Sequence, residues 1–122
     1  LQIFKSNGIG KKPYISEKTI IRPTFSYMGK FTISDSVFRQ IAEYIADKMP
    51  SIYKVLRTRV QSSDVGTSIY MEVTVTYGYN IQDVLKEFRS RAEKEIEKLT
   101  SMNVTEFEVV AKNVYIPQNE EN

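Results

Sequence analysis

The hydrophobic pattern of this chain changes its period near residue 78. From residue 69 to residue 77, apolar and polar side chains alternate strictly, and this period of two predicts a half-buried β-strand. Its inward-facing set is Ile69, Met71, Val73, Val75 and Tyr77. After Gly78 the apolar positions recur every three or four residues, which predicts an amphipathic helix with Asn80 as its N-cap. The apolar stripe of this helix is Ile81, Val84, Leu85, Phe88, Ala92, Ile96 and Leu99.

A similar strand-to-helix pattern occurs earlier in the chain. A short strand over residues 30–33 leads to Ser34, a favourable N-cap, and to Asp35 in the first helical turn. Pro50 ends this helix because proline cannot donate the backbone hydrogen bond that continues it. The apolar face is wide enough to cover a sheet, and it consists of Val37, Phe38, Ile41, Ala42, Ile45, Ala46 and Met49.

Two further strands complete the predicted fold. Residues 55–61 alternate, with Leu56, Thr58 and Val60 inward, and a turn at 62–66 joins them to the strand of residues 69–77. After the second helix, residues 100–103 turn the chain into a last strand with Phe107, Val109 and Ala111 inward. The order strand, helix, strand, strand, helix, strand predicts an α+β two-layer sandwich. Two helices would cover one face of a four-stranded mixed sheet.

The face of this sheet that the helices leave open is polar and carries both signs of charge. Such a face is either solvated or part of an interface, and exposed edge strands also offer unpaired backbone groups to a partner. The candidate interaction surface consists of Arg57, Arg59, Tyr70, Glu72, Glu106 and Glu108.

Charge is unevenly distributed along the chain, and its distribution suggests a division into three segments. Residues 1–30 contain six Lys or Arg and one Glu, whereas residues 100–122 contain one Lys and four Glu. We therefore expect a basic N-terminal arm or linker over residues 1–28, a folded domain over 29–117 and an acidic tail over 118–122. Basic and acidic ends can drive head-to-tail contacts or attract a charged partner, but they also simply keep a domain in solution.

The composition excludes several kinds of chemistry. The chain has no His and no Cys, which excludes histidine-based triads, thiol nucleophiles and the usual zinc sites. Tyr44 and Lys48 have the spacing of a dehydrogenase motif, but the glycine-rich nucleotide-binding turn that this motif requires is missing. We therefore expect no catalytic residue, no metal, no cofactor and no small-molecule substrate. No apolar run is long enough to span a membrane.

Three segments of the chain resemble the alkaline shock protein family of small bacterial stress proteins. They are Gly29–Ala42, Val73–Val84, with its Tyr-Gly before an Ile-x-x-Val helix, and Val104–Val110. The resemblance extends over residues 29–116. One difference is that Ser101 follows Thr100 after the second helix, where the family usually has Gly. The resemblance implies a cytoplasmic, non-catalytic protein connected with cell-envelope stress, which a membrane-anchored partner can hold at the inner face of the membrane.

Two functions from different classes follow from these observations. The first is a protein that acts through association, either with copies of itself or with a protein partner that is anchored in the membrane. The alternative is an RNA-binding module in which Tyr70 stacks on a base beside Arg57 and Arg59. The acidic residues of the same face oppose RNA binding, because they cancel the positive field that phosphates require.

Overall fold

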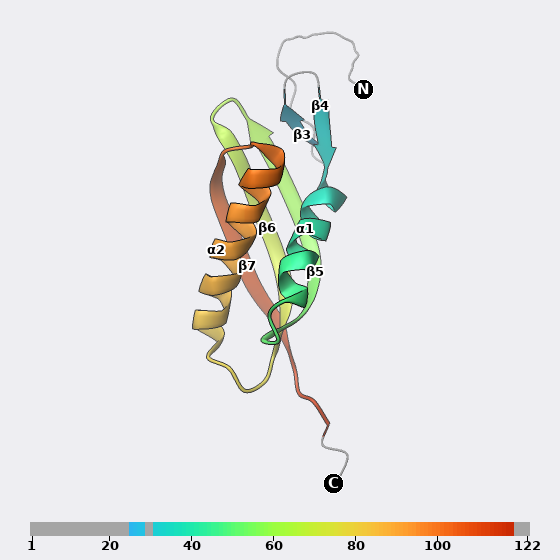
Figure 1. Cartoon of the computed structure of the whole chain (residues 1–122), viewed down its shortest axis with the longest axis vertical. Coiled ribbons are helices and arrows are strands. Elements are labelled where there is room, and N and C mark those ends of the chain that lie inside the picture. Colours follow the sequence, from blue (N-terminus) through green and yellow to red (C-terminus); the bar gives the residue numbers. More distant parts are fainter. Residues whose placement is uncertain (1–24, 29–30, 119–122) are drawn as a thin grey trace.

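The computed structural model describes residues 25–28 and 31–118 of the chain (Figure 1). Residues 1–24 of the predicted arm and residues 119–122 of the predicted tail lie outside this description. The elements are β3 (Phe25–Met28), β4 (Phe31–Ser34), α1 (Asp35–Asp47), β5 (Ile52–Ser63), β6 (Gly66–Thr76), α2 (Ile81–Thr100) and β7 (Val104–Tyr115).

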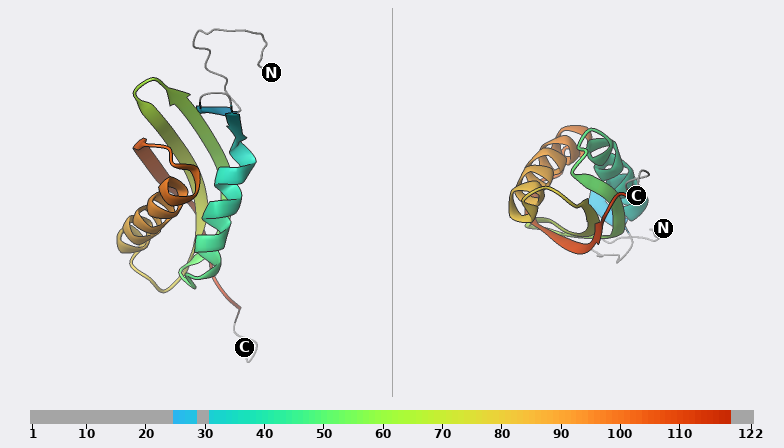
Figure 2. Two further views of the ribbon diagram at one scale, coloured as in Figure 1. Left: turned by 45° about the horizontal axis from the view of Figure 1, so that its top comes forward. Right: turned by 90° about the horizontal axis from the view of Figure 1, so that it is seen from below.

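The main sheet has three strands in the order β5-β6-β7, with β6 in the centre. β6 is antiparallel to β5 and parallel to β7, so the sheet is mixed. Both helices lie on the same side of this sheet and leave its other side uncovered (Figures 1 and 2). The prediction of an α+β fold with two helices on one face of a mixed sheet is therefore confirmed.

The predicted fourth strand does not join this sheet. The strand expected at residues 30–33 exists as β4, but it pairs antiparallel with β3 in a separate two-stranded sheet. Phe31 is 73% exposed, so the first half of β4 is not inserted into the core. The prediction missed β3, which lies at the end of the segment assigned to the arm and takes the pairing that β4 would otherwise offer to the main sheet.

The helix starts agree with the expected capping residues. The Ser34 hydroxyl accepts a hydrogen bond from the Ser36 backbone N–H (3.1 Å), and the Asn80 side-chain oxygen accepts one from the Asp83 N–H (3.0 Å). These bonds satisfy backbone donors that have no partner within the helix.

The end of α2 has an unusual backbone conformation. Ser101 has φ 61° and ψ 17°, and its backbone N–H donates to the Glu97 carbonyl (2.8 Å). Within residues 25–28 and 31–118 it is the single non-glycine residue with positive φ. Glycine is the usual residue in this conformation because it has no β-carbon to crowd the backbone.

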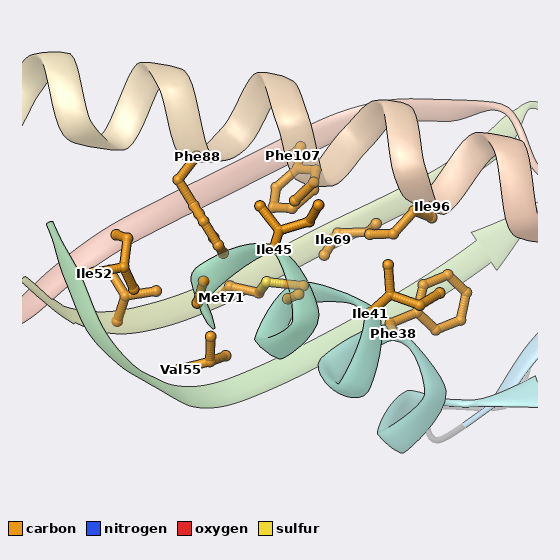
Figure 3. Packing of buried hydrophobic residues seen from close by; sticks show 14 of the residues in the cluster. Phe38, Ile41, Ile45, Ile52, Val55, Ile69, Met71, Phe88, Ile96 and Phe107 are labelled. Carbon is orange, nitrogen blue, oxygen red and sulfur yellow. The ribbon is translucent and has the colours of Figure 1, made fainter. Parts of the chain in front are cut away.

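The hydrophobic core fills the space between the helices and the sheet (Figure 3). Phe38 from α1, Phe88 and Ile96 from α2, and Met71 from β6 are completely buried. The predicted apolar stripes are correct over most of each helix. Leu99 lies beside the buried face of α2, which continues from Ile96 to Thr100. Three residues expected to be buried are exposed: Val37, Ile81 and Leu99.

Irregularities in both edge strands explain where the predicted alternation fails. In β5, Val55 pairs with Val73 but Thr58 pairs with Met71, so β5 has one extra residue there, and a second shift follows Ile52. β7 has similar shifts against β6. Strand β5 begins at Ile52, whereas the sequence predicted residue 55. Val55 is buried although strict alternation would place it on the outer face. Such bulges twist edge strands and make them poorer templates for edge-to-edge pairing.

Candidate interaction surface

The open face of the sheet presents its side chains in rows that cross all three strands. Arg59 of β5 lies opposite Tyr70 of β6, and Tyr70 lies opposite Glu108 of β7. In the next row, Gln61 lies opposite Ser68, which lies opposite Glu106.

Two arginines and two glutamates of this face lie on opposite edges of the sheet. β5 carries Arg57 and Arg59, whereas β7 carries Glu106 and Glu108, and both strands are edges because β6 lies between them. All four residues are exposed. In this part of the open face, a basic edge and an acidic edge are therefore separated by one strand, whereas Lys112, farther along β7, is a cation that pairs with Glu72 of the central strand.

Glu72 contacts two other polar side chains at the centre of the face. Its carboxylate accepts a hydrogen bond from the Tyr70 hydroxyl (2.8 Å) and lies 3.8 Å from the Lys112 ammonium. The side chain of Glu72 is 14% exposed, and that of Lys112 is 57% exposed. The Ser68 hydroxyl similarly donates to Glu106 (3.3 Å). These bonds hold the central strand's polar side chains in place.

The field at Tyr70 is dominated by the acidic residues. The hydrogen bond to Glu72 is the main cause of a raised pKa of the Tyr70 hydroxyl, and the charges of Glu72 and Glu108 add to it. The nearby Arg57 guanidinium lowers the pKa of Tyr70, but it does not reverse the shift. The hydrogen bond to a carboxylate, burial and nearby negative charges all favour the neutral form of a phenol.

All six residues of the predicted surface line one open depression in the structure. Three residues from the two helices also line it: Asp35, Arg89 and Glu93. The prediction did not include them, because the helical pattern indicated only that they lie on the surfaces of the helices. The structure thus brings together the residues that the sequence grouped. Their role in binding stays a prediction.

Asp35 stands at the edge of this depression, beside β5. Its Oδ1 atom is buried and accepts no hydrogen bond from the residues described here. Partial burial raises the pKa of the Asp35 carboxyl, and the Val60 backbone and the Arg59 charge oppose this effect. The sequence identified Asp35 only as a favourable helix-start residue.

Aromatic residues gather at the end of the sheet where β5 begins and β7 ends. The rings of Tyr53 and Tyr115 stack with their centroids 3.9 Å apart and their planes at 10°, which joins the two edge strands across β6. Tyr77 and Tyr79 lie in the following turn and are also exposed. The prediction that Tyr77 faces the core is wrong: it is 66% exposed, because β6 ends at Thr76 and Gly78 turns the chain away.

Tyr44 and Lys48 make a contact that does not resemble a catalytic pair. The Lys48 ammonium lies 4.3 Å from the centre of the half-exposed Tyr44 ring, at the end of α1. This is a cation–π contact of the kind that stabilises protein surfaces.

Among residues 25–28 and 31–118, no group of three or more acidic side chains is arranged to hold a metal ion. In the same part of the chain, no helix is both long and apolar enough to cross a membrane.

Comparison with models of known protein families gives a match over the second half of the chain. A model of the alkaline shock protein 23 family, described as having a cell envelope-related function, matches residues 57–116. This range contains β6, α2 and β7 as well as all six residues of the predicted surface. No curated protein and no solved structure matches the chain. The matched range, which includes the characteristic Tyr-Gly segment before α2, confirms the resemblance to the alkaline shock protein family over residues 57–116.

Proposed function

We propose that this protein is a non-catalytic component of the cell-envelope stress response and that it acts through protein–protein association. The open face of the sheet, with its basic and acidic edges, is the observation that carries this proposal. The partner is either a second copy of the chain or a membrane-anchored protein that holds this chain at the inner face of the cell membrane.

The arrangement of charges supports association more than solvation. Exposed ion pairs on helices usually join neighbouring residues of opposite sign, and α1 and α2 have such pairs in Arg39–Glu43 and Arg91–Glu87. On the open sheet face, Arg59 and Glu108 are instead separated by the whole width of the central strand. Charges separated in this way attract a surface with the opposite arrangement and fix its orientation.

RNA binding has weaker support. Tyr70 lies near Arg57, as a base-stacking site requires, but its hydroxyl is bonded to Glu72, and acidic residues dominate the field around it. If RNA is the partner, binding will depend steeply on salt and will be lost when Arg57 and Arg59 are both changed to Ala. No binding to RNA at low salt would exclude this alternative.

The proposal is tested by site-specific photo-cross-linking in the cells that make the protein. A photoreactive phenylalanine analogue replaces Tyr70 on the open face, and in a control variant it replaces Leu99, which is 58% exposed on the helical side. We expect a protein adduct from position 70 and none from position 99. Reversing the charge of both Arg57 and Arg59 should abolish the adduct. The absence of an adduct at position 70, or equal adducts at both positions, would contradict the proposal.

A further inference from the structure

The order of charges in one row of the open face is self-complementary. One row reads Arg59, Tyr70, Glu108, which is a positive side chain, an aromatic side chain and a negative side chain on successive strands. A half-turn about an axis that runs parallel to the strands and above Tyr70 exchanges the two edges and keeps the strand direction. The same row, read on the rotated copy, has its negative end over the first copy's positive end.

We propose that two copies of this chain associate with their open sheet faces together, about a two-fold axis above Tyr70. This inference rests on the proposed function and names a second copy as the partner of the same surface. In this arrangement, Arg59 of each copy faces Glu108 of the other copy, so the ion pair forms twice. Gln61 in the adjacent row faces Glu106 of the second copy, and an amide donor thereby meets a carboxylate.

The dimensions of the face are compatible with these contacts. Facing sheets pack about 10 Å apart, a distance that an Arg and a Glu side chain can bridge together. The two half-buried Tyr70 rings meet near the axis, where their hydrogen bonds to Glu72 hold them in place.

Two other arrangements of the same face are less favourable. An axis perpendicular to the strands would place β5 over β5 and β7 over β7, so that like charges face each other. Edge-to-edge pairing of β5 with β7 would also join opposite charges, but both strands have register shifts that interrupt their edges. That pairing would also leave a free edge on every copy and would grow without limit.

The small size of the face predicts a weak dimer. Three strands at a spacing of about 4.8 Å make a face only about 14 Å wide. An interface of this size, held largely by ion pairs, should form at high protein concentration and dissociate when salt is added.

Charge exchange tests the arrangement directly. In a two-fold dimer, Arg59→Glu places two carboxylates opposite each other at both contacts, and Glu108→Arg places two cations there. We expect each single variant to bind itself at least about tenfold more weakly than the unchanged chain, because opposed like charges are costly. When the two variants are mixed, each of the two contacts again joins one carboxylate to one guanidinium, so the mixture should dimerise again. The double variant Arg59→Glu/Glu108→Arg should dimerise with itself for the same reason.

The measurement is solution mass by sedimentation or light scattering over a range of protein concentrations. The unchanged chain and Arg91→Glu, a control on the helical side, should approach twice the chain mass of 14.1 kDa and go no further. Rescue by mixing also excludes misfolding of the single variants, because a misfolded chain would not regain association.

Three results would overturn this inference: single variants that dimerise as well as the unchanged chain, a mixture that stays monomeric, or a mass that grows beyond the dimer. A chain that stays monomeric at every concentration would also overturn it. If the Tyr70 position still cross-links to a different protein in that case, the proposed function survives and only the two-fold dimer fails.

Discussion

At the scale of single residues, Ser101 and Asp35 occupy places that their own chemistry does not favour. Ser101 has a left-handed backbone conformation where glycine is the usual residue. Asp35 stands at a helix start, which favours a carboxylate, but one of its oxygens is buried without a hydrogen bond from the described residues. Both conflicts have consequences for stability that can be measured.

Replacing Ser101 with Gly should stabilise the protein by roughly 0.5–1 kcal/mol. A left-handed conformation costs a residue with a β-carbon about 1–2 kcal/mol, and the greater freedom of Gly in the unfolded chain offsets part of the gain. The measurement is the free energy of unfolding in urea. Ser101→Ala keeps the β-carbon and should show no comparable gain, so equal stability of the Gly and Ala variants would contradict this account.

Replacing Asp35 with Asn should remove a pH-dependent loss of stability. Burial raises the pKa of Asp35 in the folded state above its ordinary value of 3.8, so the folded protein binds this proton more tightly than the unfolded chain. The stabilising effect of protonation is complete below 3.8 and is lost as the pH rises through the folded-state pKa.

The stability of Asp35→Asn relative to the unchanged chain should therefore increase from acidic to neutral pH. Urea unfolding of both proteins on each side of this range measures the difference. A difference that stays constant with pH, or that decreases toward neutral pH, would show that Asp35 has no raised pKa in the folded protein.

At the scale of elements, the turn between β5 and β6 packs closely against the start of β7. A β-carbon placed on Gly66 would overlap the Thr105 methyl group and would lie 3.0 Å from the Asn103 carbonyl oxygen. The Thr67 backbone N–H also donates to that carbonyl (2.9 Å). This contact fixes where the parallel strand β7 begins against β6.

Gly66→Ala should therefore destabilise the protein by about 1–3 kcal/mol, because the β-carbon must displace β7. Gly78→Ala is the matched control: Gly78 also has a positive φ of 113°, but a β-carbon there would meet no atom within 4 Å. We expect a smaller loss for Gly78→Ala, from backbone strain alone. Equal losses of unfolding free energy in the two variants, measured in urea, would mean that the close contact with Thr105 does not add to the destabilisation.

At the scale of the whole molecule, the core that the structure describes lies in the middle of the chain. Among residues 31–118, the buried hydrophobic residues all lie between Phe38 and Phe107. We therefore expect the folded unit to be separable from the charged segments predicted at the two ends.

A chain that begins at residue 25, and therefore keeps β3, should have the same unfolding midpoint as the full chain, because every core residue that the structure describes is retained. Thermal or urea unfolding of both proteins makes the comparison. A marked fall in stability would show that residues 1–24 pack on the domain. Solution mass of the shortened chain separately tests whether the basic segment contributes to association.

Local periodicity predicted most of the elements because burial of one face imposes a characteristic spacing. The alternation from Ile69 to Val75 gave β6, and the stripe through Phe88 and Ile96 gave α2. The predicted alternation was wrong where an edge strand contains an extra residue, as between Val55 and Thr58. A bulge shifts the pattern of buried positions without changing which residue types are present. The candidate surface followed from the same alternation, which is why its six residues lie together.

The sequence by itself determined the fold class, the helix starts at Ser34 and Asn80 and the polar character of the open face, because each depends on the spacing of nearby residues. Tertiary structure decided which strands pair. β4 pairs with β3 instead of the main sheet, and the stack of Tyr53 on Tyr115 joins residues that are far apart in the chain. Tertiary structure also decided that Arg59 and Glu108 share one row. Pairing depends on competition among backbone groups distant in sequence, and local spacing contains no information about that competition.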